Sequence, residues 1–158
     1  MIMKTTFLVV GRTTDSHIQA LVDDYKKRLT HYLSFEMVVI PELKNTKNLS
    51  EEQQKEAEGK LLLQQVEPSA ILILLDEHGK EYRSIEFADR MQQFMLAGRN
   101  IVFAIGGPYG FAKAVYDRAD YKISLSKMTF SHQMVRLIFV EQLYRAMTIL
   151  RGEPYHHE

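Results

Sequence analysis

Short apolar runs and helically spaced apolar positions alternate along this chain. The short runs are rich in β-branched and aromatic residues, which is typical of strands that are buried on both faces. They occupy residues 5–10, 35–40, 70–75, 100–105 and 121–124. Because segments with helical spacing separate these runs, the pattern predicts an α/β fold in which helices flank a parallel sheet.

Residues that typically begin a helix precede the first two predicted helices. Asp15 or Ser16 can cap the first helix, and Ser50 with Gln53 three residues later has the pattern of a capping box for the second. The expected helices cover residues 16–32, 50–66, 84–97, 111–119 and 134–150, with a loop at 42–49, a turn at 76–79 and a glycine turn at 106–110.

The last helix is apolar around almost its whole circumference between Met134 and Leu150. A helix that faces one core needs only an apolar stripe. The surplus apolar surface therefore needs a second cover, and another copy of the chain is the simplest one. We expect a homodimer.

Composition narrows the class of protein. The chain has 158 residues without a linker or an internal repeat, so we expect one domain, residues 1–158. It has no cysteine, which excludes disulfides and thiolate metal sites and favours the cytoplasm. No cluster of His, Asp or Glu has the spacing of a metal site. No apolar run has the length of a signal peptide or a membrane span, so neither a metal nor a membrane is an expected partner.

The formal net charge is zero. Indiscriminate binding of nucleic acid rests on neutralising phosphates, so the charge argues mildly against it. An RNA partner would have to be recognised by its shape and by a few contacts.

Three loops follow buried strands and are candidates for a shared pocket. They are residues 75–79, 106–110 and 125–130, and ligands of parallel sheets bind beyond the carboxyl ends of the strands. The glycine turn is neither a GxGxxG fingerprint nor a lysine-containing phosphate loop, so nucleotide phosphate is a poor candidate. Closely spaced glycines would let an adenosine-like group approach the backbone, although a plain strand-to-helix turn explains them equally well.

Several polar residues near the end of the chain could carry chemistry, and each has an ordinary alternative. His132 could be a helix-start residue that makes a local hydrogen bond. Glu141 and Arg145 stand four apart and could be an intrahelical ion pair. Tyr155 and His156 could belong to a frayed end.

Taken together, these residues resemble the SPOUT class of knotted RNA methyltransferases. Within that class the resemblance is to small single-domain enzymes that N3-methylate a pseudouridine of 23S ribosomal RNA, and it spans essentially the whole chain. The combination is specific although each piece alone is weak. The matching pieces are residues 7–11, 40–41, 75–76, 79–80, 105–110, 124–130, 132, 135–136, 141, 143–146 and 154–156.

The resemblance implies an α/β fold with a C-terminal trefoil knot, S-adenosyl-L-methionine as methyl donor, a homodimer, and 23S rRNA within the ribosome as partner. Family contacts to the cofactor correspond to Leu75, Gly106, Leu125, Ser126, Lys127, Met128, Thr129 and Phe130.

The chemistry of the reaction suggests the catalytic candidates. The N3–H of a uracil-type ring must lose its proton around the time of attack. His132 and His156 are candidate bases, Arg136 and Arg145 are candidate stabilisers of the ring anion, and Tyr155 could stack on the base. Glu141 completes the set of candidate catalytic residues.

Two alternatives remain open at this point. The chain could be a methyltransferase of the same class that acts on another RNA, such as a tRNA. It could also be a non-catalytic α/β module that binds an adenosine ligand, although that would leave the polar tail unexplained.

Overall fold

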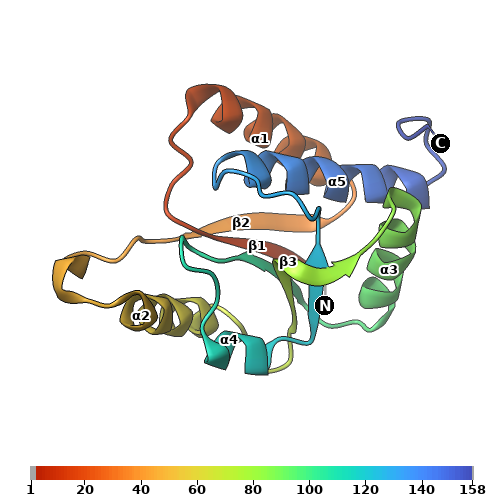
Figure 1. Ribbon diagram of the computed structural model, residues 1–158. Helices are drawn as coiled ribbons and strands as arrows, with labels where there is room; N and C mark the ends of the chain where they lie inside the picture. The colour runs from red at the N-terminus through yellow and green to blue at the C-terminus, as the bar shows by residue number, and fades with distance from the viewer. Residues whose placement is uncertain (1–2, 158) are drawn as a thin grey trace.

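A five-stranded parallel sheet runs through the middle of the computed structural model, which describes residues 3–157 (Figure 1). The strand order is β2-β1-β4-β3-β5 and every pairing is parallel. The carboxyl ends of the strands therefore point toward the same edge of the sheet. The strands are β1 (Lys4–Val10), β2 (Ser34–Ile40), β3 (Ile71–Glu81), β4 (Ile101–Ile105) and β5 (Tyr121–Ser124).

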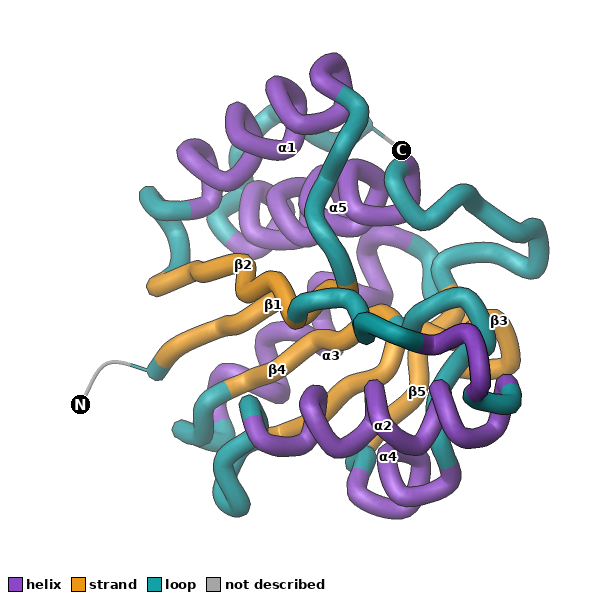
Figure 2. Tube along the Cα trace, turned by 90° about the vertical axis from the view of Figure 1, so that its left-hand side faces the viewer, coloured by secondary structure: helices purple, strands orange, loops and turns teal. Residues whose placement is uncertain are grey.

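Helices cover both faces of the sheet, which confirms the predicted parallel α/β architecture. Helices α1 (Ser16–Leu29), α3 (Ser84–Leu96) and α5 (Met134–Leu150) pack on one face, with α5 in contact with the other two. Helices α2 (Glu51–Gln64) and α4 (Lys113–Arg118) pack on the opposite face (Figure 2). The trefoil knot stays a prediction of the resemblance.

The two faces have separate cores because neighbouring residues of a strand point to opposite sides of the sheet. Under α5, the ring of Phe139 lies 4.5 Å from Phe7 and 4.8 Å from Phe103, measured between centroids. On the other face Leu8 packs with residues of α2 and α4. The central strands are thus buried on both sides, as their continuous apolar runs predict.

The predicted helix starts are also confirmed. The Asp15 carboxylate accepts hydrogen bonds from the backbone N–H groups of His17 and Ile18. Ser50 and Gln53 form the reciprocal bonds of a capping box. The first helix ends at Leu29, three residues earlier than expected, and the chain continues in a turn.

Two other boundaries differ from expectation. The turn predicted at residues 76–79 is wrong, because β3 continues to Glu81 with a register shift between Leu75 and Lys80. Gly79 makes this possible, since a Cβ there would lie 2.7 Å from the backbone nitrogen of Ile123. Helix α4 begins at Lys113 because the preceding Phe111 is buried in the second core.

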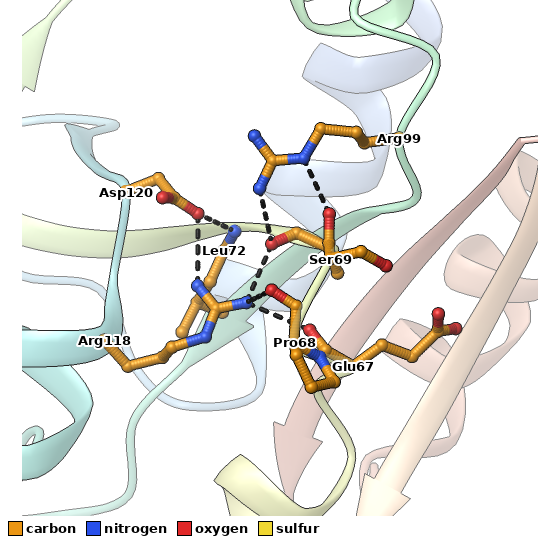
Figure 3. A network of polar contacts seen from close by, with 8 residues as sticks. Glu67, Pro68, Ser69, Leu72, Arg99, Arg118 and Asp120 are labelled. Atoms are coloured by element: carbon orange, nitrogen blue, oxygen red, sulfur yellow. Dashed lines mark hydrogen bonds and ion pairs between the residues drawn. The ribbon is translucent and has the colours of Figure 1, made fainter.

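A polar network fixes the edge of the sheet away from the loops of interest (Figure 3). Asp120 accepts hydrogen bonds from the backbone N–H of Leu72 at 2.9 Å and from Arg118 at 3.2 Å. Arg118 also donates to the carbonyl of Ala70, and Arg99 donates to that of Ser69. These bonds attach the start of β5 to the turn that enters β3.

Among residues 3–157, no helix is long and apolar enough to cross a membrane.

Candidate functional site

The three predicted loops meet in one pocket of about 300 Å³ at the carboxyl ends of β3, β4 and β5. The predicted cofactor residues line it, with the exception of Lys127. The lining residues are Leu75, Asp76, Glu77, Ile105, Gly106, Gly107, Pro108, Gly110, Phe111, Tyr116, Leu125, Ser126, Met128, Thr129, Phe130, His132 and Val135. We call this the strand-end pocket.

The loop at 125–130 is held in shape by short-range hydrogen bonds. Ser124 donates to the carbonyl of Ser126 at 2.9 Å, and the Ser126 hydroxyl accepts from the backbone N–H of Met128 at 2.9 Å. Lys127 lies outside the pocket, and its ammonium group is 3.7 Å from the carboxylate of Glu81. Its side chain is therefore not placed to contact a ligand in this pocket.

The glycine turn is tight enough to explain its glycines. Gly110 has a φ of +83°, which favours glycine, and its N–H donates to the carbonyl of Gly107 at 3.1 Å. A Cβ at Gly106 would lie 3.1 Å from the carbonyl carbon of Gly110. A side chain at Gly106 would thus press on the turn that forms one side of the pocket.

The sequence analysis placed residues 75–79 among the pocket loops but did not single out the acidic side chains there. Asp76 and Glu77 line it directly after the apolar run of β3, and Tyr116 comes from α4. The Tyr116 hydroxyl donates to Asp76 at 2.6 Å. Burial and then this hydrogen bond raise the pKa of Tyr116, so the phenol stays protonated. The position of Asp76 at a strand end was the available signal, whereas nothing marked Tyr116.

The buried side chain of Arg136 holds two elements of the fold together. Its guanidinium donates to the carbonyls of Val10, Gly11 and His132 and to the hydroxyl of Thr13. These bonds connect the start of α5 to the end of β1. Burial lowers the pKa of Arg136, while the charge of Glu42 acts in the opposite direction. An arginine has five N–H donors, so one more acceptor can be bound.

His132 lies at the edge of the strand-end pocket, and its backbone carbonyl is one of the acceptors of Arg136. Its side chain is exposed. His132 and Arg136 are therefore the candidate catalytic residues nearest to this pocket.

The other four candidates form a separate cluster at the end of α5, which we call the tail cluster: Glu141, Arg145, Tyr155 and His156. Arg145 donates to Glu141 at 2.7 Å and lies 3.1 Å from Nδ1 of His156. Its guanidinium also lies over the ring of Tyr155. The hydroxyls of Tyr155 and Tyr25 are 3.0 Å apart in a hydrogen bond. The tail is thus packed onto the helices, and Glu141 and Arg145 do form the intrahelical ion pair.

The contacts of His156 determine what it can do. Arginine N–H groups only donate, so Nδ1 of His156 must be the acceptor of the bond from Arg145. In the neutral ring, Nε2 then carries the hydrogen. That nitrogen is buried and has no hydrogen-bond partner among the described residues. As placed here, His156 offers a donor instead of a base.

The tail cluster and the strand-end pocket lie at different positions along α5. The pocket meets α5 at Val135, and Arg145 follows ten residues later. At about 1.5 Å per residue, the separation along the helix axis is about 15 Å. Figure 1 shows the C-terminal tail at the end of α5 that is farther from the entering loop. One chain therefore does not bring the two sets of candidates together.

Comparison with known proteins finds a matching family model and several similar relatives. A family model described as "Predicted SPOUT methyltransferase" matches residues 3–156. The chain is 63% identical over 157 residues to the ribosomal RNA large subunit methyltransferase H of Phocaeicola vulgatus, covering 99% of this chain and 100% of the relative. It is 61% identical to the protein of that name from Bacteroides thetaiotaomicron, again over 99% and 100% of the two chains. The protein of that name from Flavobacterium johnsoniae is 53% identical with the same coverage.

One prediction concerns the binding of S-adenosylmethionine, the cofactor that the family resemblance implies, in the strand-end pocket. Gly106→Val places a branched side chain against Gly110, so the affinity measured by calorimetry should fall about tenfold or more. Lys127→Ala is the matched control on the neighbouring loop and should leave the affinity unchanged. Circular dichroism should show that both variants fold. Unchanged binding by Gly106→Val would move the cofactor site elsewhere.

Proposed function

This chain belongs to the SPOUT methyltransferase family, and we propose that it transfers a methyl group from S-adenosylmethionine to N3 of a pseudouridine in 23S ribosomal RNA. Relatives that are 53% to 63% identical over the whole chain are named for the ribosomal RNA of the large subunit. The observation that carries the proposal is the strand-end pocket, which is lined by all the residues that the family resemblance assigns to the cofactor except Lys127. We also propose a cytoplasmic location, because the proposed substrate is part of the ribosome.

The strand-end pocket fits S-adenosylmethionine in its chemistry. Leu75, Ile105 and Leu125 provide apolar surface for an adenine ring, and the carboxylates of Asp76 and Glu77 can accept hydrogen bonds from ribose hydroxyls. The cofactor supplies a methyl group on a positively charged sulfur, which is already electrophilic. The protein therefore has to position the acceptor nitrogen and make its lone pair available.

Two residues of the same chain can assist at N3. His132 lies at the pocket edge, and the unprotonated nitrogen of a neutral imidazole can take the N3 proton. Arg136 has a spare N–H and can stabilise negative charge that develops on a ring carbonyl. Its other bonds hold it in place, so little reorganisation is needed when the charge forms.

We place the tail cluster at the active site of a second copy. A tail cannot reach its own pocket about 15 Å away along a rigid helix, but a partner whose α5 runs in the opposite direction could present one there. In that arrangement Tyr155 would stack on the target base, and Nε2–H of His156 would donate to a ring carbonyl. Arg145, held by Glu141, would orient His156 through Nδ1.

The surface of α5 limits where the partner can bind. Helices α1 and α3 flank α5, so the chain itself covers much of the apolar circumference. Phe139 is fully buried in the core, whereas Ile138 remains partly exposed and Met134 is 41% exposed. We therefore propose that the homodimer surface includes Met134 and Ile138.

Charge on this surface should disrupt the dimer. Ile138→Glu would bury an unpaired carboxylate if a partner covers the site, which is unfavourable by several kcal/mol. Light scattering should then report a monomer at concentrations where the unchanged protein is a dimer. Leu96→Glu makes the same chemical change on α3, where Leu96 is 81% exposed, and should remain dimeric. A monomeric unchanged protein at micromolar concentration would refute the dimer.

Removal of the tail should affect methyl transfer more than binding. Deleting residues from Pro154 onward should leave S-adenosylmethionine affinity and dimerisation nearly intact while lowering methyl transfer about tenfold or more, or about 1.4 kcal/mol. Tyr155→Phe keeps the ring but loses its bond to Tyr25, and Tyr25→Phe loses the same bond from the other side. If Tyr155 acts only by stacking, Tyr155→Phe and Tyr25→Phe should have similar rates of methyl transfer. His156→Ala should then have a lower rate than either. Full activity of the truncated protein would exclude Tyr155 and His156 and leave His132, Arg136, Glu141 and Arg145 as candidates.

The choice of substrate should depend on assembled shape. A chain of zero formal net charge cannot bind RNA strongly without specific contacts at physiological salt. With labelled S-adenosylmethionine, intact ribosomes should therefore be methylated far faster than naked 23S rRNA, and digestion to nucleosides should place the label on N3 of pseudouridine. Preferential labelling of tRNA would favour the first alternative. Cofactor binding without transfer to any RNA would favour the non-catalytic module.

A further inference from the structure

A second pocket of about 330 Å³ adjoins the strand-end pocket, and the function proposed above assigns it no ligand. It lies between the end of β1, the segment that follows β2, one face of α2, the glycine turn and the start of α5. We call it the α2 pocket. Its lining residues are Val10, Arg12, Thr14, Glu42, Leu43, Thr46, Gln54, Glu58, Gly107, Pro108, His132, Gln133 and Arg136.

The two pockets share a wall made of Gly107, Pro108 and His132. A planar ring held in the α2 pocket would therefore have one edge next to the cofactor pocket. His132, the candidate acceptor of the N3 proton, stands at this boundary. The α2 pocket is thus placed where the acceptor base of a methyl transfer has to be.

Its polar groups match a ring that carries both N–H donors and carbonyl acceptors. Glu42 and Glu58 offer acceptors, while Arg12 and Arg136 offer donors. The two carboxylates disfavour a phosphate group in this space. A uracil-type ring has alternating N–H and C=O groups along one edge and complements the pocket.

Glu58 has no bonding partner within the described part of the protein. Among residues 3–157, its carboxylate accepts no hydrogen bond and forms no ion pair. Its carboxylate lies directly against Gly107, where any Cβ would overlap it. Burial raises the pKa of Glu58, and the charge of Glu42 adds to the shift. A donor from a bound ring would supply the missing partner, because hydrogen bonds to an ionised carboxylate are stronger than those between neutral groups.

We propose that the α2 pocket receives the target pseudouridine and that Glu58 accepts a hydrogen bond from its N1–H. This inference rests on the function proposed above. Pseudouridine is joined to ribose through carbon, so its N1 keeps a hydrogen, whereas N1 of uridine carries the ribose. Glu58 therefore reads the one ring position at which the two nucleosides differ as donors.

The geometry of the ring makes the assignment coherent. N1 and N3 flank the carbonyl at C2, so N1–H can point to Glu58 on α2 while N3 faces the shared wall and the cofactor. The C2 carbonyl between them can then accept the remaining N–H of Arg136, which lines the same pocket. A site built around a hydrogen bond rejects analogues that lack the group, because its own polar atom is left unpaired.

The test compares two substrates and three proteins. The substrates are ribosomes with pseudouridine at the target position and ribosomes made without the pseudouridylation, which carry uridine there. The proteins are the unchanged chain, Glu58→Ala, and Glu56→Ala, whose exposed carboxylate lies on the same helix outside the pocket. The measurement is kcat/KM for methyl transfer, with calorimetry of S-adenosylmethionine binding and thermal unfolding as checks.

The unchanged chain and Glu56→Ala should prefer pseudouridine about tenfold or more. Glu58→Ala should lose about tenfold on pseudouridine while staying within about twofold on uridine, so the preference disappears with cofactor affinity unchanged. A retained preference in Glu58→Ala would overturn the inference. An equal loss on both substrates would also overturn it and make Glu58 a general base. If the unchanged chain methylates neither substrate, the proposed function itself fails, which is a distinguishable result.

Discussion

The packing of Phe139 between Phe7 and Phe103 is the contact on which the arrangement of the site depends. It joins the middle of α5 to the two central strands in a core from which water is excluded. Aromatic pairs at these distances contribute beyond their buried area, so the helix has one preferred position on the sheet. With its middle fixed, α5 must begin beside the strand-end pocket and end at the tail cluster.

Arg136 complements this contact at the start of the helix. Its hydrogen bonds to the end of β1 set where α5 begins, and one of its acceptors belongs to His132. The same residue lines the α2 pocket. A single buried cation thus connects the support of the fold to the place where we propose that the base binds, which is why Arg136 cannot be described as either purely structural or purely catalytic.

The sequence predicted the strands well because continuous apolar runs mark strands that helices cover on both sides, as in residues 70–75. It also predicted that three loops would meet, since parallel strands end at one edge. It failed where tertiary contacts decide: β3 passes its predicted turn because Gly79 fits against β5. The outward position of Lys127, the buried state of Arg136 and the orientation of the His156 ring each depend on residues distant in sequence. Glu58 was missed because only the folded chain places it on the glycine turn.

The network of Arg99, Arg118 and Asp120 lies at the edge of the sheet opposite the pockets. Its arginine side chains donate hydrogen bonds to backbone carbonyls of the turn before β3. The loops that line the pockets are held mainly by hydrogen bonds between residues close in sequence. Substitutions in those loops therefore leave the hydrogen bonds of this network intact. Such a separation gives the fold mutational tolerance: the loops that line the pockets can change while the opposite edge keeps the bonds that stabilise it.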